Sequence, residues 1–303
     1  MQRRKFLSTL AAAGLIASFL RADKPPSFTF GFSLYAMKGR KTEDALRDVA
    51  AIGFESVELC LLAGYDAAPA NLDEARRRSI RQSLQDTKLR LTALMENLDM
   101  NAADPKPYGE KLDRAFALGN ALSPDALPVV ETVLGGGDWS KVKTRFRDRV
   151  GALAEVAAKA KGVLAIKPHR LQALNRPEDA VWLLDQVRSP ALRLVFDWSH
   201  FQFRDLSLEG TVRQLIPHTA YLHVKDVTVR DGKTLFALPG EAANLDYVEL
   251  LNTVVAAGYH GDISCEVSGH VQSRKDYDGL TAARQCYKNL APAVEKVRRK
   301  QSR

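Results

Sequence analysis

The sequence predicts a single (β/α)8 barrel, also called a TIM barrel, and three observations support this prediction. From residue 28 onward, short apolar runs alternate with longer amphipathic stretches, and eight such runs can be counted. Each run is nearly continuous in apolar or β-branched residues, as expected of parallel strands covered on both faces. No change of composition divides the 303 residues, and undivided barrels of this length are common. An open parallel sheet is the alternative, because closure of a sheet is not visible in a sequence.

Apolar periodicity and helix-boundary residues locate the individual elements. Gly53 and Gly258 are expected to end two helices, and Asp246 to cap the start of the second of them. The expected strands are residues 28–34, 56–61, 90–95, 128–134, 162–166, 193–196, 220–224 and 262–267. The expected helices are residues 42–52, 72–87, 140–161, 177–187, 208–215, 246–257 and 280–296.

The start of the chain has the three-part layout of an export signal. A basic segment at residues 1–5 precedes an apolar stretch at 7–20, which is short for a membrane-spanning helix. Arg3 and Arg4 resemble the twin-arginine signal, so we expect export to the periplasm. The residues after the apolar stretch fit a cleavage site poorly, so an uncleaved leader acting as a membrane anchor is the alternative. The expected division is a leader with its linker, 1–24, and one barrel domain, 25–303.

Net charge and cysteine usage argue against two classes of protein. The formal net charge is +8, but part of it lies in the leader and the rest is spread over expected helix faces. Because no basic run is interleaved with aromatic residues, we expect no nucleic-acid partner. Cys60, Cys265 and Cys286 have the spacing of neither a disulfide framework nor a zinc ribbon. With the leader removed, we expect no stable membrane partner either.

Polar side chains end nearly every expected strand, at the edge where a barrel carries its active site. Each of them alone has a structural explanation, such as a helix cap or an acid paired with an arginine. Ionisable groups gathered at one edge, however, need a cation, one another or a substrate to offset the loss of water. The predicted site residues are Glu58, Glu131, Lys167, His169, Asp197, His200, His223 and Glu266.

Asp197, His223 and Glu266 come from three consecutive strands and provide two carboxylates and one imidazole. Such a set suits a divalent Mn, Mg, Co or Zn ion. The ion would hold two adjacent substrate oxygens and polarise a carbonyl, which eases removal of a proton from the neighbouring carbon. A carboxylate or a lysine on each face of the substrate would carry that proton.

An ordered set of short motifs resembles the xylose isomerase-like TIM-barrel superfamily of sugar phosphate isomerases and epimerases. The likeness covers nearly all of residues 28–295, although no single motif is specific by itself. It implies a small carbohydrate as substrate and leaves open whether the chain forms a homo-oligomer. The motifs are GFESVEL at 53–59, IKPH at 166–169, DWSH at 197–200, HVKD at 223–226 and EVS at 266–268.

The resemblance also implies a metal, held by a Glu after the fifth strand, an Asp after the sixth, a His after the seventh and a Glu after the eighth. Three of these ligands correspond to Asp197, His223 and Glu266, but the fourth position is Lys167. His200 matches a histidine that contacts substrate, and His169 matches a polar residue at the same edge.

Lys167 leaves three arrangements open, because an ammonium repels a divalent cation beside it by several kcal/mol. In the first, which we favour, Glu131 replaces the missing ligand and Lys167 turns toward the substrate. In the second, Lys167 occupies the place of the metal and pairs with Asp197 and Glu266. In the third, the barrel binds a sugar without converting it. The first arrangement assigns the metal to Glu131, Asp197, His223 and Glu266, and catalysis to Lys167, Glu58, His169 and His200.

We therefore expect a sugar isomerase or epimerase that removes a proton next to a carbonyl, through an enediolate. An unphosphorylated sugar or sugar derivative is the expected substrate, because the chain lacks a phosphate-binding motif and an exported enzyme would meet few sugar phosphates. The alternatives are a lyase or hydratase acting on keto-glycosides with the same residues, and a non-catalytic sugar-binding barrel. A DNA endonuclease of the same superfamily is disfavoured, because the chain has only six histidines.

Overall fold

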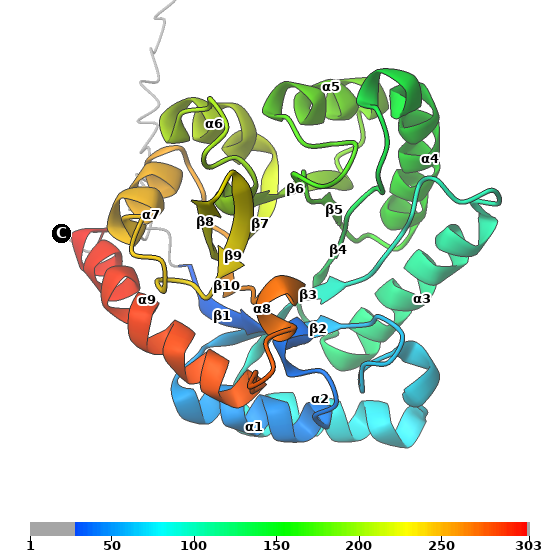
Figure 1. Cartoon of the computed structure of the whole chain (residues 1–303). Coiled ribbons are helices and arrows are strands. Elements are labelled where there is room, and N and C mark those ends of the chain that lie inside the picture. Colours follow the sequence, from blue (N-terminus) through cyan, green and yellow to red (C-terminus); the bar gives the residue numbers. More distant parts are fainter. Residues whose placement is uncertain (1–27, 302–303) are drawn as a thin grey trace, which may run out of the picture.

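The computed structural model describes residues 28–301, so the expected leader lies outside the described residues. Parallel strands close into one barrel in the order β1-β10-β7-β6-β5-β4-β3-β2, which confirms the barrel and excludes the open sheet (Figure 1). The barrel strands are β1 Phe30–Ser33, β2 Ser56–Cys60, β3 Arg90–Met95, β4 Val129–Thr132, β5 Leu164–Ile166, β6 Leu192–Asp197, β7 Thr219–Val224 and β10 Ile263–Cys265.

A ring of helices surrounds the strands, and each helix contacts the next one along the ring (Figure 1). The last of them contacts both the first and the one before it, so the ring closes together with the sheet. The helices of the ring are α1 Thr42–Ile52, α2 Glu74–Thr87, α3 Lys106–Leu122, α4 Trp139–Lys159, α5 Pro177–Val187, α6 Leu208–Leu215, α7 Tyr247–Ala256 and α9 Gly279–Gln301.

Two of the expected helix boundaries are confirmed in detail. Gly53 ends α1 in the left-handed conformation, with φ of 115°. The side chain of Asp246 accepts hydrogen bonds from the backbone N–H groups of Val248 and Glu249 at the start of α7. Gly258, just past the end of α7, also has a positive φ, of 91°.

Helix α3 was not among the expected helices, and its composition explains why. Pro107, Gly109 and Gly119 interrupt the helical pattern and lower the intrinsic helix propensity. Packing compensates for this, because Leu112 and Phe116 are buried against the core. Tertiary contacts thus stabilise a helix whose local sequence does not favour it.

The segment after β7, expected to be a loop, is an antiparallel hairpin formed by β8 Asp226–Arg230 and β9 Lys233–Ala237. Asp231 and Gly232 connect its strands with φ values of 50° and 71°. Two positive φ values are what a tight type I′ hairpin turn requires, and an Asp-Gly pair favours that turn. The hairpin lies beside the end of β7 and contacts the short helix α8, Gly269–Gln272 (Figure 1).

The buried apolar side chains of the described residues form three clusters, one of which is made of Cys60, Tyr65 and Met95. The large core lies between the strands and the ring of helices. A small cluster of Ala93, Ala165, Val195 and Tyr221 fills the inside of the barrel. Because these residues form one layer, the inward-facing side chains that follow them on the strands lie toward the C-terminal mouth of the barrel. None of the described helices is both long and apolar enough to cross a membrane.

Candidate active site

The twofold periodicity of the strands turns six of the predicted site residues toward the barrel interior. Side chains two residues apart on a strand point to the same face. Since Ala165, Val195 and Tyr221 face the barrel interior, the residues two positions further on face it as well. This step leads to Lys167, Asp197 and His223, and the same step leads from Ser56 to Glu58, from Val129 to Glu131 and from Ser264 to Glu266.

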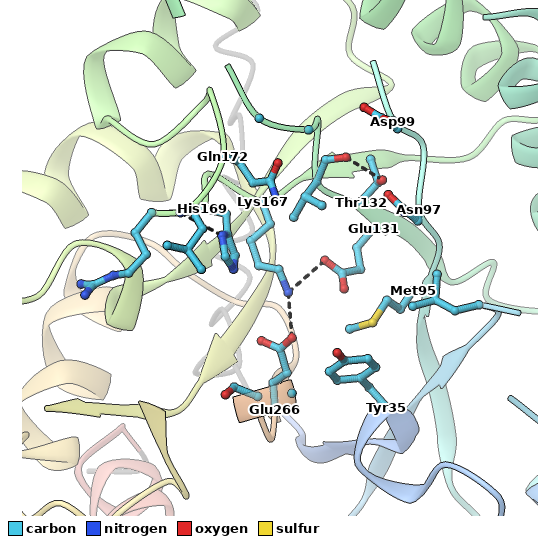
Figure 2. A pocket seen from close by; sticks show the side chains of 18 of the residues that line it. Tyr35, Met95, Asn97, Asp99, Glu131, Thr132, Lys167, His169, Gln172 and Glu266 are labelled. Atoms are coloured by element: carbon cyan, nitrogen blue, oxygen red, sulfur yellow. Dashed lines mark hydrogen bonds and ion pairs between the residues drawn. The ribbon is translucent and has the colours of Figure 1, made fainter. Parts of the chain in front are cut away.

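A cavity of about 740 Å³ opens at the C-terminal mouth of the barrel, a size suited to a small-molecule ligand. Of the predicted site residues, Glu131, Lys167, His169 and Glu266 line this cavity (Figure 2). The other four are buried and lie outside the described lining of the cavity; they are Glu58, Asp197, His200 and His223. The site therefore has an accessible layer and a buried layer beneath it.

Lys167 lies between the two carboxylates that line the cavity. Its Nζ is 3.1 Å from Oε1 of Glu266 and 3.5 Å from Oε2 of Glu131 (Figure 2). It is also 3.0 Å from Nδ1 of His223. Burial lowers the pKa of Lys167, but Glu131 and Glu266 raise it further, so the amine is held protonated. The ammonium is thus a fixed positive charge at the floor of the cavity.

Lys225 is a second buried ammonium, and it was not among the predicted site residues. Its Nζ is 2.9 Å from Oδ2 of Asp197 and makes a short hydrogen bond to Oε2 of Glu266. Burial lowers the pKa of Lys225, but Asp197 and Glu266 raise it by more, so the pKa lies above its ordinary value. A sequence signal for Lys225 exists, because it follows the inward-facing His223 by two residues.

Glu266 is the carboxylate shared by both lysines. Lys167 contacts its Oε1 and Lys225 its Oε2, so each oxygen has an ammonium partner. Burial by itself raises the pKa of Glu266, but the two lysines and His223 lower it well below the usual range. Glu266 is therefore held as an anion.

Glu131 has fewer partners than Glu266. Among the described residues its Oε2 accepts no hydrogen bond and has Lys167 as an ion-pair partner at 3.5 Å. Burial raises its pKa to about 7, even though Lys167 lowers it. A carboxyl group that is half protonated near neutral pH can both accept and return a proton.

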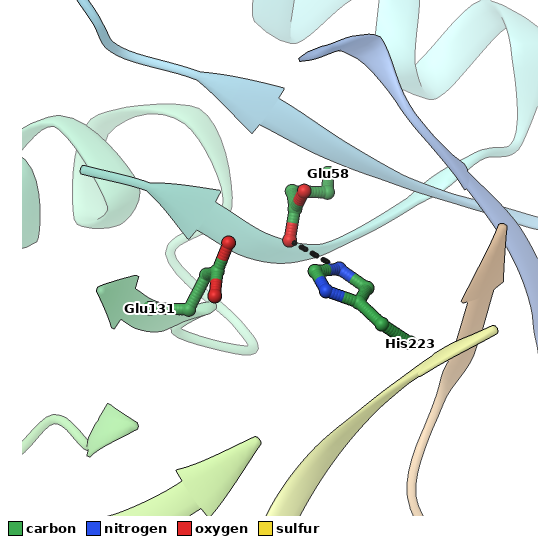
Figure 3. A group of neighbouring side chains, drawn as sticks. All are labelled: Glu58, Glu131 and His223. Atoms are coloured by element: carbon green, nitrogen blue, oxygen red, sulfur yellow. Dashed lines mark hydrogen bonds and ion pairs between the residues drawn. The ribbon is translucent and has the colours of Figure 1, made fainter. Parts of the chain in front are cut away.

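Glu58 and His223 form a pair beneath the cavity. Nε2 of His223 is 3.1 Å from Oε2 of Glu58 (Figure 3). Ser33 donates a short hydrogen bond to the other oxygen of Glu58. Burial and Lys167 lower the pKa of His223, but Glu58 and Glu266 raise it above its ordinary value overall. Because an ammonium can only donate, the contact with Lys167 requires an unprotonated Nδ1, and the proton of the ring then lies on Nε2, toward Glu58. This pair orients Lys167 and does not itself reach the cavity.

The two remaining predicted histidines lie against each other, with ring centroids 3.9 Å apart. Burial, together with the nearby Lys225 and Lys167, lowers the pKa of His169 to about 3, so its ring is neutral. Nδ1 of His169 accepts the backbone N–H of Leu171, which leaves its Nε2–H free to donate. Burial also places the pKa of His200 well below its usual value, with its Nε2 3.4 Å from Asp197.

The β8–β9 hairpin covers one side of the cavity through Phe236, a second residue that sequence reasoning missed. Its ring centroid is 5.4 Å from Nζ of Lys225 and 5.7 Å from the ring of His200. Arg170 fixes the hairpin by donating to Oγ1 of Thr234 at 2.9 Å. The hairpin was expected to be a loop, although the Asp231-Gly232 pair is a sequence signal for a hairpin and could have led to Phe236.

Two groups of side chains have the spacing needed to hold a metal. They are Glu58 with Glu131 and His223, and Asp197 with His223 and Glu266, and within each group the ligand atoms lie within 4.8 Å of one another. The favoured four-ligand arrangement is not reproduced as a single group, because Glu131 clusters with Glu58 and not with Asp197 and Glu266.

The contacts of the second group do not fit a metal ion. Lys225 bridges Asp197 and Glu266, and Lys167 donates to Nδ1 of His223, so all three candidate ligands already contact an ammonium. A dication 3.5 Å from one ammonium would be repelled by roughly 9 kcal/mol at an effective dielectric near 20. Lys167 contacts Glu266 as the second sequence-based arrangement expects, but Lys225 is the lysine that contacts Asp197.

Comparison with known proteins identifies the family of this barrel. Residues 46–290 match the model of the xylose isomerase-like TIM barrel family. A mouse (Mus musculus) protein named "Putative hydroxypyruvate isomerase" is 28% identical over 170 residues, which are 52% of this chain and 59% of the mouse protein. The match thus spans less than two thirds of that relative.

Two solved structures share the fold at low sequence identity. The structure of an L-ribulose 3-epimerase superposes with a TM-score of 0.69 at 19% identity, covering 90% of this chain and 97% of that one. A xylose isomerase-like TIM barrel protein from Mycobacterium smegmatis, in complex with magnesium, superposes with a TM-score of 0.70 at 16% identity, covering 89% and 98%. With most of its barrel matched by the family model, this chain belongs to the xylose isomerase-like TIM barrel family.

Proposed function

We propose that the protein is an isomerase or epimerase that moves a proton on the carbon next to a carbonyl of an unphosphorylated sugar or sugar derivative. The observation that carries this proposal is the placement of Glu131, Lys167 and Glu266 in the cavity. Strands β4 and β10 lie opposite each other in the closed barrel, so the two carboxylates face the cavity from opposite sides. The Lys167 ammonium lies between them (Figure 2).

Each of these groups has a distinct part in the proposed reaction. Glu131 takes the proton from the carbon, and the electron pair left behind forms the carbon–carbon double bond of an enediolate. The carbonyl oxygen becomes an anion, which the Lys167 ammonium stabilises. Glu131 then returns the proton to the adjacent carbon, and the hydroxyl proton passes between the two oxygens. The neutral His169 donates from Nε2 to a substrate hydroxyl.

The contacts favour isomerisation over epimerisation within this proposal. Epimerisation needs an acid on one face of the carbon and a base on the other. Glu266 is paired with an ammonium at each oxygen and is held as an anion, so it is a poor proton donor. Glu131 alone can shuttle a proton, and one group on one face is sufficient for a transfer between adjacent carbons.

Deuterium incorporation tests the proposal directly. The protein without residues 1–24 is incubated in D2O with unphosphorylated aldoses, ketoses and hydroxypyruvate, and exchange is followed by NMR. We expect one substrate to exchange deuterium at the carbon next to its carbonyl. Glu131→Gln should lower kcat by roughly 100- to 10,000-fold, because it removes the proton carrier. Glu110→Gln, which changes an exposed carboxylate on α3, is the matched control.

The other outcomes correspond to the alternative functions. Loss of a leaving group without exchange into recovered substrate would identify a lyase or hydratase. Binding of a sugar that Lys167→Ala and Asp197→Ala weaken, with no conversion of any substrate, would identify a binding barrel and refute the proposal. Phosphorylated forms of each sugar, tested in parallel, decide whether the substrate carries a phosphate.

We also propose that the protein is exported, on the strength of Arg3, Arg4 and the apolar stretch that follows them. Export supports an unphosphorylated substrate, since sugar phosphates are largely confined to the cell interior.

A further inference from the structure

Two buried ammonium groups share one carboxylate beneath the cavity. Lys167 and Lys225 are 4% and 3% exposed, and they contact opposite oxygens of Glu266. We propose that these two lysines together take the place of the divalent metal, so that the site works with a permanent, covalently attached pair of positive charges. This inference rests on the proposed function only in taking the same cavity as the active site.

The inference is based on which side chains Lys167 and Lys225 contact. Lys225 lies between Asp197 and Glu266, the two carboxylates of the second candidate metal group. Lys167 lies against the imidazole of that group, at 3.0 Å from Nδ1 of His223, and against the second oxygen of Glu266. A cation bound to these three side chains would have to displace both ammonium groups.

The same lysines also compensate the buried negative charge. Isolated buried carboxylates are costly unless they are paired and hydrogen-bonded. Each carboxylate of the buried layer and the cavity floor contacts a lysine or a histidine: Glu131 contacts Lys167, Glu58 contacts His223, and Asp197 contacts Lys225. Charge compensation is therefore built into the chain.

Both lysines line the cavity, so they can reach a substrate. An ammonium has three donor hydrogens. Lys225 donates a hydrogen bond to Glu266 and forms an ion pair with Asp197, so a donor hydrogen remains available for a substrate oxygen. Phe236 flanks this ammonium at 5.4 Å and shields it from bulk water. Two adjacent substrate oxygens would thus meet two ammonium groups instead of one metal ion.

Metal content of the wild-type protein is the first measurement. The protein is produced in medium supplemented with Mn, Mg, Co and Zn, analysed by elemental mass spectrometry, and titrated with Mn²⁺ by electron paramagnetic resonance. Lys167 also contacts Glu131 and His223 of the first candidate group, so a cation there would have to displace it as well. We therefore expect no stoichiometric metal, no saturable Mn²⁺ site, and a Tm that neither EDTA nor MnCl₂ changes. A stoichiometric metal, or a Tm lowered by EDTA, would overturn the inference.

Conversion of the site to a metal site is the second measurement. Lys167→Glu combined with Lys225→Met removes both ammonium groups and adds a carboxylate. This variant should bind one Mn²⁺ per chain and gain Tm when MnCl₂ is added. The matched control, Lys159→Glu with Lys296→Met, makes the same changes at exposed positions and should bind none.

The remaining outcomes are decisive as well. A folded double variant that binds no Mn²⁺ would show that the lysines do not occupy a cation site, and would refute the inference. If circular dichroism shows that the double variant is unfolded, the wild-type metal content decides alone. Because these measurements use no substrate, a metal-free protein without isomerase activity would refute the proposed function only. A metal-loaded protein with isomerase activity would refute only the inference.

Discussion

At the scale of single residues, the site depends on how partners are divided between Glu131 and Glu266. Both carboxylates contact Lys167, but Lys225 contacts Glu266 and not Glu131. The second ammonium keeps the pKa of Glu266 well below its usual value, whereas burial raises that of Glu131 to about 7. Two carboxylates on opposite sides of one cavity are therefore suited to different roles.

The raised pKa of Glu131 predicts a pH-dependent stability. An acid whose pKa is higher in the folded state stabilises the fold at low pH, and this stability is lost as the pH rises. For Glu131 the loss spans the range from the ordinary value of 4.5 to about 7. It amounts to roughly 3 kcal/mol, since each pKa unit corresponds to about 1.4 kcal/mol.

Comparison with Glu131→Gln isolates this contribution, because glutamine does not titrate. The free energy of unfolding, measured with urea at pH 5 and pH 8, should fall more with pH in the wild type than in the variant. Equal pH dependence of the two proteins would contradict the prediction.

At the scale of elements, two helices end with the same short pattern and meet different surroundings. Gly53 ends α1 and Gly258 follows α7, and both have positive φ values. A Cβ at position 53 would lie 2.6 Å from the Tyr287 hydroxyl oxygen, whereas a Cβ at position 258 would meet nothing within 4 Å. The sequence pattern is the same at both positions, but only one of them is packed against α9.

Alanine substitution should therefore separate backbone strain from packing. Gly258→Ala should cost about 1 kcal/mol of stability, from the left-handed backbone alone. Gly53→Ala should cost more, roughly 2–4 kcal/mol, because Tyr287 must also move. Denaturant unfolding of both variants measures the difference, and equal losses would contradict this account.

At the scale of the whole molecule, the barrel closes only when its first and last strands pair. Phe30 of β1 lies opposite Ile263 of β10, and α9 contacts α1. The fold is thus complete only after nearly the whole chain has been synthesised. This suits the twin-arginine route, which carries proteins that have already folded.

Replacement of the arginine pair tests the proposed export. With both Arg3→Lys and Arg4→Lys, the protein should stay in the cytoplasm of a bacterial host, whereas the control Lys5→Arg should still be exported. Fractionation followed by immunoblotting locates the protein, and mass spectrometry of the N-terminus shows whether the leader is removed. Export of the double variant would contradict the twin-arginine assignment.

The barrel strands, most of the helices, and the edge at which the polar residues gather could be predicted from the amino-acid sequence. This is possible because apolar periodicity and helix-ending glycines are local properties of the chain. The positions of Glu58, Glu131, Lys167, Asp197, His223 and Glu266 near the C-terminal ends of the expected strands also predicted that they gather at one edge of the barrel.

Which of these residues contact one another could not be predicted, because it depends on how the barrel closes. That Lys225 bridges Asp197 and Glu266, that Glu131 clusters with Glu58, and that Phe236 flanks the site are matters of distance across the barrel. Such distances depend on the closure of the sheet and on the hairpin after β7, and neither is encoded in local periodicity. The choice between a metal and a pair of lysines is a property of the closed barrel.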